Sequence, residues 1–148
     1  MTLREMEIDD LDQVMEIEKE LFSVPWTKEG FFTFLMKENA MFLVVEEKGS
    51  ILGYCGILTV LDEGDITNVA VRRERQKEGI GYFMTDGLIR LCQERGVNII
   101  HLEVRRSNQS AIRLYEILGF KEDGIRKNYY ADPSEDAILM TRMADASL

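Results

Sequence analysis

Apolar side chains recur along the chain with two spacings that alternate from segment to segment. Helical spacing predicts helices over Asp10–Phe22, Thr27–Glu38 and Gly79–Arg95, and a short helix that Ser107 or Asn108 caps and that ends at Gly119. Apolar, β-branched runs predict strands over Thr2–Glu7, Met41–Glu46, Ile51–Val60, Asp65–Val71, Asn98–Val104, Phe120–Glu122 and Asp136–Met143. The order β-α-α-β-β-β-α-β-α-β-β favours an α/β fold with a mixed (α+β) sheet, in one domain over residues 1–148.

Two helix ends carry local signals. Asp10 followed by Gln13 resembles a capping box, in which two side chains bind backbone N–H groups at the start of a helix. Gly96 is the expected C-terminal stop of the third helix. The apolar stripe of that helix is Ile80, Phe83, Met84, Leu88, Leu91 and Cys92.

Composition narrows the class of protein. With 45% hydrophobic residues the chain can bury a core, and it has no apolar run long enough for a transmembrane helix. The N-terminus lacks the basic and then apolar layout of a signal peptide, so we expect a cytoplasmic protein. Cys55 and Cys92 lie in apolar stretches without the spacing of a metal site, which predicts reduced core thiols and no metal.

Charge is unevenly distributed along the chain. The net charge of −9 argues against nucleic acid as a direct ligand, and no membrane partner is expected. Residues 1–71 contain 5 Lys/Arg and 15 Asp/Glu, whereas residues 72–148 contain 13 and 12. This asymmetry fits either a cationic partner that meets the first half or ordinary solvated charge.

The segment Val69–Gly81 combines a strand end, a charged loop, two glycines and a helix start. Glycine lets a ligand approach the backbone, and the free N–H groups at a helix start bind phosphate. Basic side chains in the loop are Arg72, Arg73, Arg75 and Lys77. The longer glycine motifs of ATP and dinucleotide sites are absent. Gly-x-Gly alone is also compatible with a plain turn.

Two motifs, in this order and spacing, resemble those of a known family. Gln76–Gly81 (Gln-x-x-Gly-x-Gly), after the strand end Val69–Val71, resembles the acetyl-CoA signature of the GNAT N-acetyltransferases, and Ser107–Phe120 resembles their second motif. The flanking pieces Phe22–Thr27 and Arg126–Tyr130 resemble the bacterial ribosomal-protein-alanine N-acetyltransferases, the RimI subgroup. The resemblance covers nearly the whole chain and implies a GNAT-like acyl-CoA N-acyltransferase fold.

The resemblance also implies a binding site for acetyl-CoA, in the gap where the fourth and fifth strands splay apart. By this match the backbone of Val69, Ala70 and Val71 bonds the pantetheine arm, and Asn108 contacts the cofactor. The implied pyrophosphate loop is Lys77, Glu78, Gly79, Ile80, Gly81 and Tyr82, and Gln76 of the same motif is a further cofactor-binding candidate. Two residues depart from the family pattern: Arg73 stands where many relatives have Pro, and Glu78 brings a negative side chain into the loop.

Acetylation of an amine requires a group that accepts a proton, and Glu103 is the candidate base. It lies in the largely apolar run Ile99–Val104, where a carboxylate is costly unless it is used or paired. From the residues alone, a pair with Arg105 or Arg106 is the alternative, and the resemblance favours the base. Strand alternation places His101 on the same face, so it is a competing candidate.

The departing thiolate needs a proton, and Tyr115 is the candidate acid. It shares a helical stripe with Ala111, Ile112 and Leu118, so core packing is the alternative. The resemblance implies that this tyrosine faces the sulfur of the cofactor.

Large aromatic side chains suggest where the amine enters. Trp26, Tyr129 and Tyr130 lie in segments predicted to be loops. The resemblance implies that these segments wall a slot for a chain terminus, although each side chain could simply cover the core. Acidic candidates near the slot are Asp62, Glu63, Asp65 and Asp136, which would suit a basic protein N-terminus such as that of a ribosomal protein.

Together these expectations indicate an acetyl-CoA-dependent N-acetyltransferase that acts on the N-terminal alanine amine of a ribosomal protein. An enzyme for lysine side chains or a small-molecule amine remains an alternative. A non-catalytic acyl-CoA-binding module is a further one, and the presence of both Glu103 and Tyr115 argues against it, because a binder needs neither.

Overall fold

The computed structural model of the chain describes residues 1–144, and its strands form one seven-stranded sheet in the order β1-β2-β3-β4-β5-β7-β6. The strands are β1 (Thr2–Glu5), β2 (Ala40–Glu47), β3 (Ser50–Val60), β4 (Glu63–Val71), β5 (Ile99–Arg105), β6 (Lys121–Tyr130) and β7 (Glu135–Met143). The helices are α1 (Leu11–Leu21), α2 (Lys28–Leu35), α3 (Ile80–Glu94) and α4 (Gln109–Ile117). Short 3₁₀ turns cover Ile8–Asp10 and Arg73–Arg75. The element order confirms the predicted fold class.

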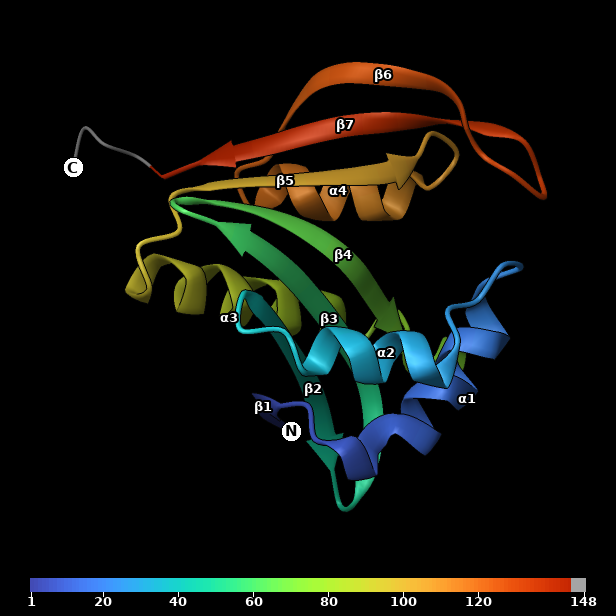
Figure 1. Cartoon of the computed structure of the whole chain (residues 1–148). Helices are drawn as coiled ribbons and strands as arrows, with labels where there is room; N and C mark the ends of the chain where they lie inside the picture. Colours follow the sequence, from blue (N-terminus) through green and yellow to red (C-terminus); the bar gives the residue numbers. More distant parts are fainter. Residues whose placement is uncertain (145–148) are drawn as a thin grey trace.

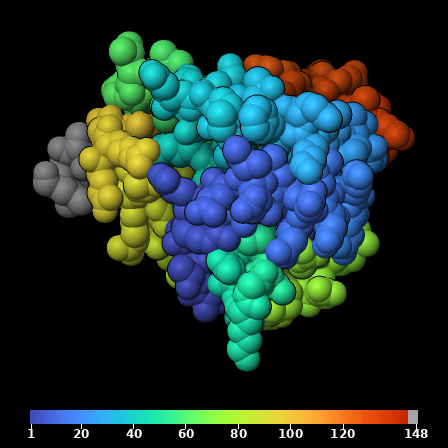
Figure 2. All heavy atoms as spheres, turned by 60° about the horizontal axis from the view of Figure 1, so that its bottom comes forward, coloured from blue at the N-terminus to red at the C-terminus, as the bar shows by residue number. Residues whose placement is uncertain are grey.

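The sheet separates two apolar cores. Helices α1 and α2 cover one face, and α3 and α4 cover the other (Figure 1). Cys55 and Cys92 are both free and buried in the core beneath α3 and α4, as predicted. Phe83 was expected in the buried stripe of α3 but is 38% exposed. Figure 2 shows α1 and α2 from outside, with the tip of the β2–β3 hairpin projecting beside them. Within residues 1–144, no helix is long and apolar enough to cross a membrane.

Strands β4 and β5 pair over only part of their length. They are parallel neighbours at Glu63–Asp65 and Ile99–His101, after which the register ends. Both strands continue, to Val71 and Arg105, and Figure 1 shows them diverging toward their arrowheads. The predicted splay of the fourth and fifth strands is therefore confirmed.

The sixth strand is much longer than the predicted Phe120–Glu122. It continues to Tyr130, so Tyr129 and Tyr130 lie at the end of a strand and the loop prediction for them is wrong. Most of its side chains are exposed because β6 is the edge of the sheet and pairs only with β7. Edge strands accept charged side chains, so β6 lacks the apolar alternation from which strands are predicted.

The first helix is anchored differently from the prediction. The Asp10 carboxylate accepts hydrogen bonds from the Arg4 guanidinium and the Glu7 N–H instead of capping α1. Gln13 instead reaches the β2–β3 hairpin, where its amide bonds Gly49 O (3.2 Å) and the Ile51 N–H (2.8 Å). The predicted caps of the other helices are confirmed: Thr27 accepts from Gly30 N, and Asn108 accepts from Ala111 N.

Candidate functional site

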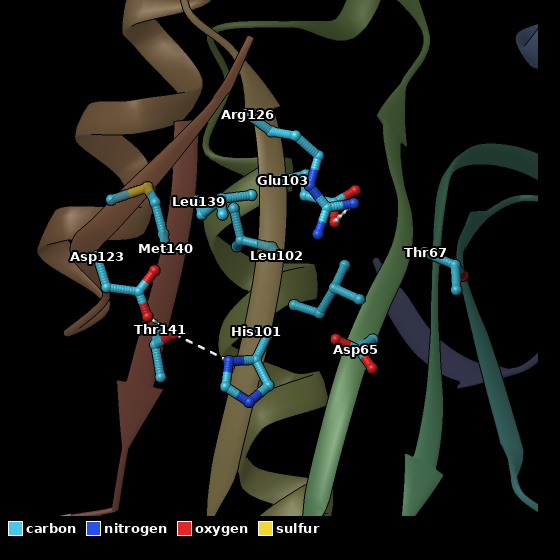
Figure 3. Close-up of a pocket in the computed structure, with 11 residues that line it drawn as sticks. Asp65, Thr67, His101, Leu102, Glu103, Asp123, Arg126, Leu139, Met140 and Thr141 are labelled. Carbon is cyan, nitrogen blue, oxygen red and sulfur yellow. Dashed lines mark hydrogen bonds and ion pairs between the residues drawn. The ribbon is translucent and has the colours of Figure 1, made fainter. Parts of the chain in front are cut away.

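A cavity of about 460 Å³ lies beside the gap between β4 and β5. Its lining comes from β4 to β7 and consists of Asp65, Ile66, Thr67, His101, Leu102, Glu103, Asp123, Arg126, Leu139, Met140 and Thr141. Glu103 and His101 both line it and share a face of the sheet, as strand alternation predicts (Figure 3). The cavity therefore opens on the sheet face opposite α4.

Glu103 is partnered by a residue that the sequence did not reveal. Its carboxylate lies 3.7 Å from the Arg126 guanidinium of β6, and Figure 3 shows both side chains meeting in the cavity. The alternative pairs predicted from sequence are wrong, because Arg105 binds Glu135 (3.2 Å) and Arg106 faces Asp136 (3.5 Å). Only the path of β6 brings Arg126 to Glu103, so no local sequence signal could have identified it.

Two phenols stand next to Glu103. Tyr129 and Tyr130 have ring centroids 5.1 Å apart at the end of β6. The hydrogen-bonding contact with Glu103, followed by burial, raises the pKa of Tyr129. Burial, with the Glu103 charge added, raises the pKa of Tyr130 to about 12. Both phenols therefore keep their protons at neutral pH and can donate hydrogen bonds at the site.

Trp26 lies in the α1–α2 loop, as predicted, but its ring packs in the core beneath α2. The ring stacks on Phe34 (4.8 Å) and contacts Phe31 (4.9 Å). Its backbone N–H donates to the buried Glu18 carboxylate, which also accepts from the Tyr54 hydroxyl. The structure thus brings Tyr129 and Tyr130 to Glu103, whereas Trp26 is not among the residues that line the cavity.

Tyr115 approaches the gap from the other face of the sheet. It is buried in the core beneath α4, with Phe120 at 5.7 Å. Burial, reinforced by the Cys55 thiol and the Tyr130 phenol, raises the pKa of Tyr115. Cys55 is the register partner of Val69 in β4, so this phenol lies next to the strand that borders the gap.

His101 is engaged at both ring nitrogens. Nδ1 lies 2.9 Å from Thr141 Oγ1, and Nε2 lies 2.9 Å from Glu63 Oε1. The Thr141 hydroxyl donates to Asp123. A ring fixed at both ends is less able to exchange protons with an amine, which favours Glu103 as the base.

The acidic residues predicted near the slot are divided by the structure. Asp65 lines the cavity, and Glu63 contacts His101, which also lines it. Asp136 instead accepts from the Asn128 N–H and pairs with Arg106, and Asp62 belongs to the β3–β4 turn, where its carbonyl accepts from Asn98 and Ile99 N–H groups.

The end of β4 directs backbone groups toward the gap. The Arg72 N–H bonds Leu52 O, and Ala70 is the register partner of Tyr54, so these residues form hydrogen-bonded pairs with β3. Hydrogen-bonded and non-hydrogen-bonded positions alternate in an antiparallel ladder. The N–H and C=O groups of Val69 and Val71 therefore point away from β3, toward the space that β5 has left.

The loop after β4 leads into a helix start with free N–H groups. Gly79 precedes α3 with a φ of +85°, a conformation that favours glycine. Phe83 is the first residue to bond back, to Gly79 O (3.0 Å), which leaves the N–H groups of Ile80–Tyr82 without helical partners. The Gln76 amide ties the loop to Val71 O (3.0 Å). This arrangement fits a phosphate group.

The arginines expected to add charge to this loop bind the protein instead. Arg72 donates to Ile51 O, Arg73 donates to Glu20 O, and Arg75 holds the Glu78 carboxylate at 3.0 Å. Glu78 is therefore neutralised by its neighbour rather than directed at a ligand. Lys77 forms no ion pair within residues 1–144, unlike the arginines of this loop, so its side chain can bind a phosphate.

Comparison with known proteins agrees with this geometry. A family model described as the acetyltransferase (GNAT) family matches residues 11–120. The chain belongs to this family. GNAT enzymes use acetyl-CoA, which suits both the splayed strands and the loop before α3.

Individual relatives cover almost the whole chain. A Bacillus subtilis protein, named as a candidate [ribosomal protein bS18]-alanine N-acetyltransferase, is 42% identical over 93% of this chain and 92% of its own length. The [ribosomal protein bS18]-alanine N-acetyltransferase of Escherichia coli is 37% identical over 94% and 95%. The crystal structure of the ribosomal-protein-S18-alanine N-acetyltransferase from Escherichia coli superposes with a TM-score of 0.88, at 36% identity, over 99% of this chain and 97% of that chain. These GNAT relatives confirm the predicted family and fold.

Proposed function

We propose that this protein transfers the acetyl group of acetyl-CoA to the α-amine of the N-terminal alanine of ribosomal protein bS18. The observation that supports the chemistry is the gap between β4 and β5, with the Glu103 carboxylate on one face and the buried Tyr115 phenol on the other. The substrate comes from the relatives, whose names specify this alanine. A ribosomal substrate would place the reaction in the cytoplasm.

Different residues are assigned to the pantetheine arm and to the pyrophosphate of acetyl-CoA. Val69 and Val71 would bond the pantetheine arm through their backbone, and the N–H groups of Ile80–Tyr82 would hold the pyrophosphate, with Lys77 nearby. Asn108 would contact the cofactor from the start of α4. Acetyl-CoA supplies the activated acetyl group.

The protein's own side chains move the protons. An α-amine has a pKa of about 8 and is mostly protonated at neutral pH, so it must lose a proton to become a nucleophile. Glu103 accepts that proton, the amine nitrogen forms a bond to the thioester carbon, and the carbon–sulfur bond breaks. Tyr115 donates its proton to the sulfur, the nitrogen loses its second proton to solvent as the amide forms, and Glu103 and Tyr115 return to their starting protonation states by exchange with solvent. Tyr129 and Tyr130 donate hydrogen bonds beside the carboxylate.

The test is direct acetylation of peptides. The protein is incubated with acetyl-CoA and a basic peptide that begins Ala-Arg, beside a matched peptide with a blocked N-terminus and a free lysine, and products are identified by mass spectrometry. Acetylation only at the free N-terminus is expected. Acetylation of the blocked peptide would transfer the assignment to side-chain amines, and binding of acetyl-CoA without any product would contradict an enzymatic role on peptides.

The acidic side of the cavity predicts a preference for basic peptides. Asp65 lines the cavity, so Asp65→Lys should lower kcat/KM for a basic peptide more than for a neutral one. Asp86→Lys on α3 is the control, because among residues 1–144 the ion-pair partner of Asp86 is Arg90 on the same helix. Equal losses for both peptides would contradict recognition of charge at Asp65.

A further inference from the structure

Asn68 is a buried polar side chain of β4 to which the reaction above assigns no role. It is 9% exposed, and its Oδ1 has no hydrogen-bond partner within residues 1–144. A buried acceptor without a partner costs about 1–3 kcal/mol. Since buried polar groups in native proteins are nearly always paired, this oxygen indicates a partner that arrives with a ligand.

The neighbours of Asn68 explain why the protein itself leaves it unpaired. Its register partner on β3 is Gly56, which has no side chain. The ring of Phe42 fills the space over that glycine, because a Cβ on Gly56 would lie 2.2 Å from it. On the other side of Asn68, β5 has already parted from β4, since the last pair joins Asp65 and His101. Within the sheet, the edge of β4 at Asn68 that faces away from β3 therefore borders the gap.

The sheet register places Asn68 level with the candidate base. From the last pair, Glu103 is two residues along β5, and Asn68 is three residues along β4. A β-bulge takes up the extra residue, because the register with β3 skips Thr67. Asn68 therefore occupies the same face of the sheet as Glu103, on the other side of the gap.

We propose that Asn68 Oδ1 accepts a hydrogen bond from the α-amine of the substrate. This inference rests on the proposed function. The ammonium group carries three N–H bonds. Glu103 takes one proton and Asn68 holds a second N–H, so the lone pair freed by deprotonation is kept free for the thioester carbon. Asn68 is thus a substrate-binding residue that orients the nucleophile.

The test is Asn68→Leu, which removes the unpaired oxygen at nearly constant volume. For the peptide that begins Ala-Arg, kcat/KM should fall about 10- to 100-fold, the loss expected for a hydrogen bond to a charged group. The Kd for acetyl-CoA should not change, and the urea midpoint should stay level or rise. Asn68→Asp keeps an acceptor and should recover much of the lost activity.

Thr85→Val is the matched control, because Thr85 Oγ1 in α3 is also buried without a partner in the described chain. It should leave kcat/KM unchanged. A wild-type protein that acetylates no N-terminus overturns the proposed function and this inference with it. Wild-type activity together with an unchanged kcat/KM in Asn68→Leu overturns the inference alone, and a lower urea midpoint in that variant would assign Asn68 a structural role.

Discussion

The side chains assigned to the two proton transfers differ in their exposure to solvent. The Glu103 side chain is 34% exposed and borders a cavity, so protons can leave it for water. Tyr115 is buried on the other side of the sheet, where water cannot compete to protonate a departing sulfur. Arg126 lies against Glu103 and competes with an incoming amine for the carboxylate. The amine must therefore displace part of an existing ion pair when it binds.

Replacing the base should stop the reaction without unfolding the protein. Glu103→Gln should lower kcat by about 10²–10⁴-fold, because the amine loses its proton acceptor. Steady-state kinetics with the Ala-Arg peptide measures this change. Glu122→Gln, on the exposed part of β6, is the control and should retain activity. Comparable turnover in Glu103→Gln and wild type would show that another group is the base.

The pH profile of kcat/KM should show a rise with pH but no fall at alkaline pH. Burial raises the pKa of Tyr115 above that of an ordinary phenol, so the acid form persists while the substrate amine deprotonates. We expect kcat/KM to rise through about pH 8 and to stay level to roughly pH 10. Tyr115→Phe should lower kcat about 10²-fold or more. An alkaline fall below about pH 10 in the wild type that Tyr115→Phe abolishes would contradict the raised pKa, and unchanged turnover in Tyr115→Phe would contradict its role as the acid.

The candidate reactive groups could be predicted from the sequence, but their neighbours could not. Glu103 is a candidate because a carboxylate in an apolar strand is unusual and the family resemblance favours it as the base, and Tyr115 is a candidate because of the resemblance of its motif. Arg126 reaches Glu103 only through the path of β6, and Asn68 lies opposite Glu103 only because a bulge shifts the register. Such relations arise from strand pairing far along the chain, which no local pattern encodes.

Among the elements, the loop between β4 and α3 depends most on backbone conformation. Gly79 holds a φ of +85° at the point where the free N–H groups begin. The sequence predicted this turn well because its glycines and the following helix are local features. It predicted β6 badly, because an edge strand rich in charge has neither apolar alternation nor a local stop signal.

A methyl group at Gly79 should weaken cofactor binding through the backbone alone. Gly79→Ala introduces about 1–2 kcal/mol of strain at positive φ, and a Cβ there meets no atom within 4 Å. We expect a several-fold higher Kd for acetyl-CoA by calorimetry. Gly96→Ala is the control: Gly96 also has positive φ (+78°) and open space, at the other end of α3. It should lower the urea midpoint without changing the Kd, and equal Kd values for both variants would refute the role of the loop.

At the scale of the molecule, much of the acidic first half is neutralised from within. Arg72 and Arg73, from the loop after β4, reach Glu16 and Glu20 of α1, and Arg4 binds Asp10. The uneven charge seen in the sequence is thus partly a set of internal pairs. Asp65 and Asp123 line the cavity, where they can meet a cationic partner.

The Arg4–Asp10 pair should make the free energy of unfolding depend on pH in the acid range. The hydrogen bonds from Arg4 hold the pKa of Asp10 below its ordinary value. A lowered folded-state pKa stabilises the protein above the unfolded value of about 3.9, and this contribution is lost as the pH falls through the folded value. Asp10→Asn should therefore cost about 1–3 kcal/mol at pH 7, and the difference from wild type should shrink at lower pH.

Urea unfolding at several pH values measures this effect. Asp12→Asn is the control, because Asp12 and its partner Lys28 are both exposed, and no measurable change is expected there. A difference between Asp10→Asn and wild type that stayed constant from neutral to strongly acid pH would show that the carboxylate charge is not the cause.

The partial pairing of β4 and β5 makes the sheet two plates joined along a short seam. In the described part of the chain, three residue pairs connect β1–β4 with β5–β7, and beyond them the N–H groups of Val69 and Val71 have no strand beside them. Their amide protons should exchange quickly with deuterated water in the free protein. Once acetyl-CoA fills the gap the two plates should open as one cooperative unit, with slower exchange at these amides and about 2.7 kcal/mol of added stability at a hundredfold excess over Kd.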